Sequence, residues 1–145
     1  NIIGMETLGL RMERVCNNAF RLAQALEKLE GVSVNYPLLE SSLYHELAEK
    51  QLSGKGGAIL TIRAGSKERA YKLINHLKYV KIATNIGDVR TLVIHPASTI
   101  YIHSTPEAME EAGVYDDTIR ISVGIEDIKD LIQDFTEAVE SLGEE

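Results

Sequence analysis

The longest hydrophobic repeat of the chain lies near its start. Apolar residues recur at alternating steps of four and three from Leu8 to Leu29, a spacing that places them on one side of a helix. Gly31 follows, and glycine is a common residue just after a helix end. The repeat predicts a long helix packed on a domain. A self-associating coiled coil has the same spacing, but this pattern lasts only about three heptads.

The rest of the chain alternates short β-prone segments with helices. Four segments bounded by turn residues are expected to be strands: residues 32–36, 58–63, 80–83 and 92–95. Further helices are expected over residues 42–52, after the capping residues Ser66 and Thr105, and after Asp127. Glu126 and Asp127 are expected to lie at the positive end of the last helix.

Residues 118–123 alternate strictly between two faces of a predicted strand. Ile119, Ile121 and Val123 share the core face, so Arg120 points away from the core. Strands and helices mix without regular βαβ units, which predicts an α+β fold. We expect a small, mostly antiparallel sheet with helices on one face, preceded by a long linking helix. The predicted division is a linking helix over residues 1–30 and a small α+β domain over residues 31–145.

The composition limits which binding partners and which cellular compartment are expected for this protein. The chain has 145 residues, the size of one ordinary domain, and a net charge of -7 with a pI of about 5.1. This charge argues against nucleic acid as a partner. Cys16 is the single cysteine, and neither a signal peptide nor an apolar run that could span a bilayer is present. We therefore expect a cytoplasmic protein without a membrane partner; Glu144 and Glu145 form an acidic tail.

A few residues could carry chemistry by their type alone. Arg120 has a planar fork of donors that matches a carboxylate, although a surface arginine on an edge strand has the same local pattern. Asn85 precedes a turn and could either close it or donate to a ligand. His95 is restrained by the following proline, so we interpret it as a support for the next loop. The cysteine and the histidines lack the short paired spacings of zinc ligands, so no metal is expected.

Two stretches together resemble the Cys/Met-metabolism enzymes that use pyridoxal phosphate. They are Thr-Asn-Ile-Gly-Asp from Thr84, continuing to His-Pro-Ala-Ser-Thr at residues 95–99, and Thr-Ile-Arg-Ile-Ser-Val-Gly-Ile-Glu at residues 118–126. The Asn-Ile-Gly-Asp wording is most similar to the O-acetylhomoserine sulfhydrylases. The resemblance covers nearly the whole chain and implies the C-terminal domain of the aspartate-aminotransferase-like fold. At Ile100 and Tyr101 the sequence departs from the family's usual Thr-His.

The resemblance implies a role for several residues. Arg120 matches the arginine that binds the substrate carboxylate, Asn85 and Ile86 match positions beside that carboxylate, and Ser98 matches a residue lining the approach. In the family, a lysine in a Ser-x-Thr-Lys setting carries the cofactor. The lysines here have other settings: Lys28, Lys50, Lys55, Lys67, Lys72, Lys78, Lys81 and Lys129. The resemblance therefore implies no catalytic or cofactor-binding residue in this chain.

The implied parent enzyme replaces the acetyl-oxy group of O-acetylhomoserine by sulfide or a thiol, in the transsulfuration reactions of methionine and cysteine biosynthesis. It would be a homotetramer containing a cofactor domain, with an amino acid as substrate. We expect this chain to be inactive by itself. Three alternatives stay open: the same domain from a cystathionine gamma-synthase, a cystathionine lyase or a methionine gamma-lyase; a stand-alone amino-acid-binding module; and a proteolytic product without a role of its own.

Overall fold

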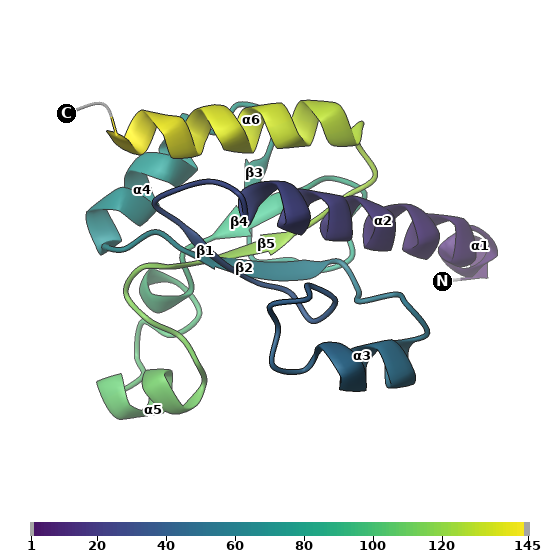
Figure 1. The fold of residues 1–145 in the computed structure, drawn as a ribbon, viewed down its shortest axis with the longest axis horizontal. Helices are drawn as coiled ribbons and strands as arrows, with labels where there is room; N and C mark the ends of the chain where they lie inside the picture. Colours follow the sequence, from purple (N-terminus) through teal and green to yellow (C-terminus); the bar gives the residue numbers. More distant parts are fainter. Residues whose placement is uncertain (1, 144–145) are drawn as a thin grey trace.

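The protein folds into one five-stranded sheet covered by helices (Figure 1), and the computed structural model describes residues 2–143, so the acidic tail lies outside it. The strands are β1 (Ser33–Asn35), β2 (Ile59–Arg63), β3 (Lys81–Ile82), β4 (Leu92–Ile94) and β5 (Thr118–Ser122). The α-helices are α1 (Ile2–Glu6), α2 (Leu8–Leu26), α3 (His45–Leu52), α4 (Lys67–His76), α5 (Pro106–Glu111) and α6 (Ile128–Glu140). Two 3-10 turns are η1 (Pro96–Ser98) and η2 (Ser141–Gly143).

The sheet has the order β1-β2-β5-β4-β3 and is antiparallel except at one edge. Only β3 and β4 run parallel, with Lys81 opposite Leu92. In the centre, β5 pairs with β2 and with β4, so that Thr61, Arg120 and Ile94 lie side by side across three strands. The predicted small and mostly antiparallel sheet is confirmed. Arg120 lies on its middle strand.

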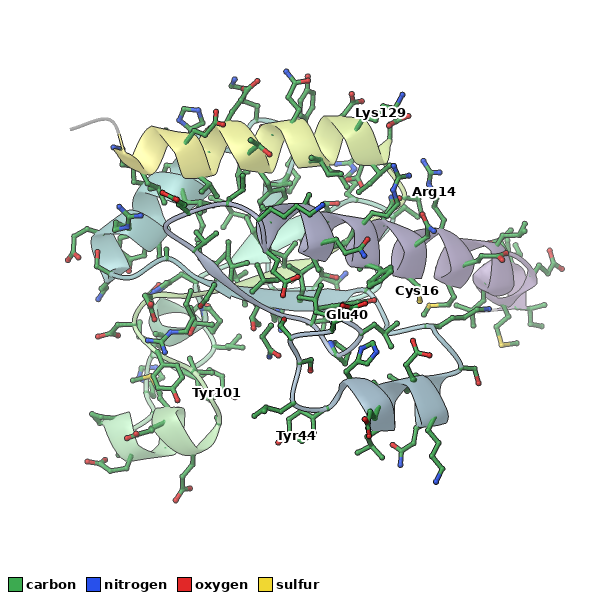
Figure 2. The ribbon with its side chains drawn as sticks, in the orientation of Figure 1. Arg14, Cys16, Glu40, Tyr44, Tyr101 and Lys129 are labelled. Carbon is green, nitrogen blue, oxygen red and sulfur yellow. The ribbon has the colours of Figure 1, made fainter. Side chains whose placement is uncertain are left out.

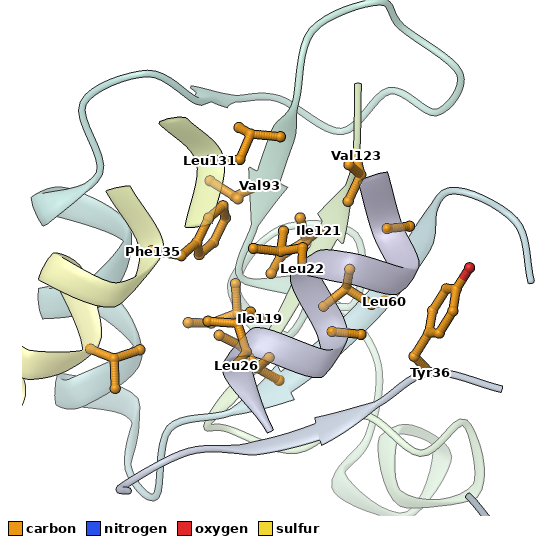
Figure 3. Packing of buried hydrophobic residues seen from close by; sticks show 14 of the residues in the cluster. Leu22, Leu26, Tyr36, Leu60, Val93, Ile119, Ile121, Val123, Leu131 and Phe135 are labelled. Atoms are coloured by element: carbon orange, nitrogen blue, oxygen red, sulfur yellow. The ribbon is translucent and has the colours of Figure 1, made fainter. Parts of the chain in front are cut away.

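One face of the sheet carries the hydrophobic core. Helices α2, α4 and α6 pack over this face, whereas α3 and α5 lie away from it (Figure 1). Figure 3 shows Leu22 of α2 and Phe135 of α6 beside Ile121 of β5. These three side chains, and Ile119, are completely buried. The alternation of the fifth strand is therefore confirmed, because its isoleucines face the core.

Most predicted helix boundaries are confirmed by their caps. The side chain of Ser66 accepts a hydrogen bond from the N–H of Arg69 at the start of α4, and Asp127 accepts one from Lys129 at the start of α6. Two details were wrong. Helix α2 ends at Leu26, although the stripe was expected to stay helical to Leu29, because residues 27–30 form turns. Helix α3 begins at His45, not at residue 42, because residues 42–44 form a turn. Glu126 lies directly before the N-cap Asp127, as predicted, and its carboxylate turns toward β4.

The apolar stripe of α2 is buried along only part of its length. Its second half joins the core, whereas Leu8 and Met12 are 45% and 41% exposed. Helix α1 extends this exposed part beyond the sheet (Figure 1). We call these residues the N-terminal apolar end: Ile2, Ile3, Met5, Leu8, Leu10 and Met12. Exposed apolar residues gathered at one end of a molecule are typical of a contact site.

Gly124 follows β5 at a position where no side chain fits. A Cβ atom there would lie 2.4 Å from the carbonyl oxygen of Val89 and 2.6 Å from the backbone carbon of Arg90. Because backbone atoms cannot move away cheaply, we expect Gly124→Ala to lower the free energy of unfolding by about 2 kcal/mol, measured by urea denaturation. Gly9→Ala is the matched control: its Cβ meets nothing within 4 Å, and a helical alanine should stabilise by up to about 1 kcal/mol. Equal stability of the two variants would contradict this explanation.

Candidate functional site

Arg120 occupies the centre of the sheet face opposite the core. Its neighbours in register are Thr61 and Ile94, and the Arg120 residue itself is half-buried. The predicted direction of this side chain, away from the core, agrees with the register. The face is nevertheless not open along the whole strand, because Thr118 and Ser122 on either side of the arginine are 3% and 2% exposed. The half-buried arginine therefore projects from a largely buried surface.

The guanidinium of Arg120 is aligned by backbone carbonyl groups. Its Nη2 donates to the carbonyl oxygen of Thr84 at 2.9 Å and lies 3.5 Å from that of Asn85. Its Nε is buried and has no hydrogen-bond partner among residues 2–143. A buried donor without a partner costs free energy, and a carboxylate is its strongest partner. The arginine is thus held in place by Nη2, while its buried Nε has no partner among the described residues.

Asn85 and Ile86 lie in an exposed turn next to this arginine. Gly87 has a φ of +80°, and the carboxylate of Asp88 accepts a hydrogen bond of 3.0 Å from the N–H of Arg90. These features bend the loop back toward β4. The structure therefore brings Asn85 to Arg120 through its carbonyl group. The amide side chain of Asn85 is exposed.

A cavity of about 200 Å³ lies between this loop and the start of α2. Ile86 and Val89 line it from the loop, while Leu8 and Met12 line it from the helix. The cavity is almost entirely apolar, so it suits hydrocarbon groups rather than charged ones. It connects the loop with the N-terminal apolar end.

Ser98 is paired within its own turn. Its hydroxyl lies 2.9 Å from Nδ1 of His95, whose Nε2 lies 2.6 Å from the carbonyl oxygen of Asp116. Because a carbonyl only accepts, Nε2 carries the proton and Nδ1 accepts from the serine. His95 is 4% exposed and stacks edge-on against Tyr71. Turn η1 packs beside β5, so Ser98 is near the site, but its hydroxyl supports His95.

Three polar residues near the site carry contacts that the sequence did not predict: Asn18, Thr91 and Glu126. The Glu126 carboxylate accepts from the backbone N–H of Thr91 at 2.5 Å and from its hydroxyl at 2.9 Å. Asn18 and Thr91 are completely buried. Only Asn18 could have been recognised from the sequence. It is a polar residue next to the apolar stripe of a long helix, where a buried polar side chain needs hydrogen-bond partners.

Other ionisable groups lie apart from this site. An exposed ion pair of 2.7 Å joins Lys78 and Glu137 and raises the pKa of the lysine. Burial raises the pKa of the Tyr36 hydroxyl, which donates to the carbonyl oxygen of Gly57. Among residues 2–143, His, Cys, Asp and Glu side chains form no group that could hold a metal ion. The same residues contain no helix long and apolar enough to cross a membrane.

The fold is that of the small α+β domain of pyridoxal-phosphate-dependent enzymes of the aspartate-aminotransferase-like class. A solved structure of a Campylobacter jejuni protein, assigned as an O-acetylhomoserine (thiol)-lyase, superposes with a TM-score of 0.91 and 36% identity, over 94% of this chain and 33% of that chain. It carries a pyridoxyl-lysine phosphate. Residues 2–140 match the family described as Cys/Met metabolism PLP-dependent enzyme, and the chain belongs to this family.

Curated relatives from several organisms are similar over almost the whole chain. Homocysteine synthase of Schizosaccharomyces pombe is 48% identical over 94% of this chain, and O-acetyl-L-homoserine sulfhydrylase 1 of Thermus thermophilus is 43% identical over 95%. An L-methionine gamma-lyase of Treponema denticola is 40% identical over 96%. The chain spans about a third of the length of these relatives, 32% to 35%.

The described residues do not fit covalent binding of pyridoxal phosphate by this chain. A lysine that carries an aldehyde cofactor is usually desolvated, which makes its amine nucleophilic. All eight lysines of this chain are exposed. The cofactor chemistry of the family therefore has no reactive lysine among these residues, and what they offer is the site around Arg120.

Proposed function

We propose that this chain is the substrate-carboxylate-binding part of a pyridoxal-phosphate-dependent O-acetylhomoserine sulfhydrylase. The single observation that carries the proposal is the buried, unpartnered Nε of Arg120, on an arginine already aligned by the carbonyl groups of Thr84 and Asn85. An arginine stays charged at any working pH, so it can bind the one group common to all α-amino acids.

Each residue of the site has a definite part in this proposal. Arg120 binds the carboxylate through its planar fork, and the backbone carbonyls of residues 84 and 85 prevent the guanidinium from rotating. Asn85 orients the carboxylate, and Ile86 provides an apolar contact beside it. Ser98 acts indirectly, because its hydroxyl is bound to His95. These residues orient the substrate and exclude water on one side.

The proposal includes a cofactor-bearing domain as the partner of this chain. The relatives are about three times as long as the chain, and the family's cofactor has no suitable lysine here. The N-terminal apolar end and the apolar cavity beside Ile86 together form a surface that such a domain would cover. A cytoplasmic, homotetrameric parent enzyme is part of the same proposal and rests on the sequence resemblance.

A fused enzyme tests this function directly. Residues 2–140 would replace the matching third of Schizosaccharomyces pombe homocysteine synthase, and homocysteine formation from O-acetyl-L-homoserine and sulfide would be measured. We expect turnover by the fused enzyme and none by the isolated chain with added pyridoxal phosphate. Turnover by the isolated chain, or an absorbing cofactor adduct that borohydride fixes on one of its lysines, would contradict the division of labour proposed here.

A second candidate is methionine gamma-lyase, because an enzyme with that name is 40% identical to the chain. The same fused enzyme should be assayed for methanethiol release from L-methionine. We favour the sulfhydrylase because Asn85 with Gly87 and Asp88 is the sulfhydrylase form of this turn. Methionine cleavage faster than homocysteine formation would reverse this preference. Tight micromolar binding of homoserine derivatives by the isolated chain would favour a stand-alone binding module instead.

A further inference from the structure

The loop over residues 84–90 is attached to the rest of the domain at both ends. At its first end, the carbonyl groups of Thr84 and Asn85 accept from Arg120. At its second end, the carbonyl of Val89 accepts a hydrogen bond of 3.0 Å from the N–H of Ile125. Between these ends, Ile86 and Gly87 are exposed. The position of the loop beside the arginine therefore depends on these two attachments.

The second attachment is reinforced by a closed ring of hydrogen bonds around Thr91. Both carboxylate oxygens of Glu126 accept from Thr91, one from its N–H and one from its hydroxyl. The same hydroxyl oxygen accepts from the N–H of Gly124 at 3.0 Å. The threonine hydroxyl thus donates to the carboxylate and accepts from the backbone at once. Because a hydroxyl has one proton, only an acceptor at the position of Glu126 completes this ring.

Helix α2 fixes the turn that carries this carboxylate. The side-chain amide of Asn18 donates to the carbonyl oxygens of Gly124 and Glu126, at 3.0 and 2.9 Å. Arg14 donates to the carbonyl oxygens of Ile125 and Glu126, at 3.3 and 3.1 Å. Figure 2 shows Arg14 on the side of α2 near the start of α6. The turn after β5 therefore sits on α2 and cannot move independently of it.

We propose that Glu126 is a positioning residue of the carboxylate site. By holding Thr91, it fixes the second end of loop 84–90, and the loop in turn presents the two carbonyl groups that align Arg120. Glu126 touches no ligand in this arrangement and acts through the loop. The proposal rests on the proposed function for its purpose, but its structural part can be tested without any substrate.

The test is NMR of the isotopically labelled 145-residue chain, with the Nε–H signal of Arg120 as reporter. In the wild type this buried proton should exchange slowly with solvent. In Glu126→Gln, the ring around Thr91 loses an acceptor, the loop opens more often, and exchange of the Arg120 Nε–H should be about tenfold faster. Thr91→Val removes the hydroxyl that donates to Glu126 and should also make the exchange faster. Thr91→Ser keeps the hydroxyl and should restore slow exchange.

Glu137→Gln is the matched control, because Glu137 also accepts charged hydrogen bonds but lies on the outer side of α6. It should leave the Arg120 signal unchanged. The proposal is overturned if Glu126→Gln and Thr91→Val both keep the wild-type exchange rate at Arg120, or if Thr91→Ser behaves like Thr91→Val. If Glu126→Gln does not fold, the exchange rates of Thr91→Val and Thr91→Ser test the proposal by themselves.

A titration with O-acetyl-L-homoserine separates this proposal from the function on which it rests. Binding weaker than the micromolar affinity of a stand-alone module should shift the Arg120 Nε–H signal of the wild type, and the dissociation constant should rise about tenfold in Glu126→Gln. If the ligand shifts nothing in the wild type, while exchange still depends on Glu126, the carboxylate function fails and the positioning role stands. If the ligand binds equally to both proteins, positioning by Glu126 is wrong and the carboxylate site stands.

Discussion

Replacing Arg120 with lysine is expected to raise the KM of the fused enzyme for O-acetyl-L-homoserine about 100-fold, with a smaller change in kcat. A lysine keeps the positive charge but offers a point charge on a flexible chain instead of a planar fork. It also leaves the carbonyl groups of Thr84 and Asn85 without their common donor. Steady-state kinetics at several substrate concentrations would measure both parameters.

Arg63 supplies the matched control for this prediction. It is another arginine on the same sheet face, but it is exposed and already paired with Asp117 at 2.8 Å, beneath the ring of Tyr115. We expect Arg63→Lys to change the KM by less than about twofold, because the Arg63 guanidinium is already bound to Asp117 and lysine keeps the positive charge. A KM that is insensitive to Arg120→Lys, or equally sensitive to both substitutions, would rule out Arg120 as the carboxylate anchor.

Truncating Leu22 to alanine should lower the free energy of unfolding by about 3 kcal/mol, the largest stability effect we predict from one residue of α2. Leu22 is completely buried against the sheet and α6 (Figure 3). The surrounding core residues cannot fill the space that the side chain leaves. Urea denaturation followed by circular dichroism would measure the change.

Leu10→Ala tests the same change on the same helix, at a side chain that is 73% exposed. Its effect on the isolated chain should stay within about 0.5 kcal/mol. A larger loss of unfolding free energy in Leu22→Ala than in Leu10→Ala would show that the second half of α2 belongs to the domain core and that its first half does not. If Leu22→Ala and Leu10→Ala cost the same, α2 does not contribute to the core as the structure indicates.

The parts of the fold that the sequence predicted depend on short-range periodicity. The alternation from Thr118 to Val123 was sufficient to place Arg120 on the face away from the core, and Ser66 was recognisable as a helix cap. The predicted division at residue 30 stays a prediction, because α2 packs on the same core as the later helices. The carboxylate role of Arg120 and of Asn85 also stays a prediction.

The parts that could not be predicted depend on contacts between distant residues. Glu126 and Thr91 are 35 positions apart, and no periodic pattern connects them. Glu126 lies at the start of α6, as the local rule for acidic residues predicts, but that rule does not predict its two hydrogen bonds to a buried threonine. The sequence predicted His95 as a support for the next loop, but it did not identify the hydroxyl of Ser98 as the partner, because that pairing depends on the imidazole proton that the carbonyl of Asp116 fixes. Side-chain pairing of this kind is decided by tertiary structure.

The alignment of Arg120 by main-chain carbonyl groups has a consequence for substrate preference. Every residue type has a carbonyl group, so substitutions at positions 84 and 85 can change what surrounds the reacting part of a substrate without releasing the arginine. Under the proposed function, binding of the carboxylate common to all amino acids would then not depend on the side chains at positions 84 and 85. Substitutions there would change the preference for the variable part of the substrate and leave the carboxylate anchor in place.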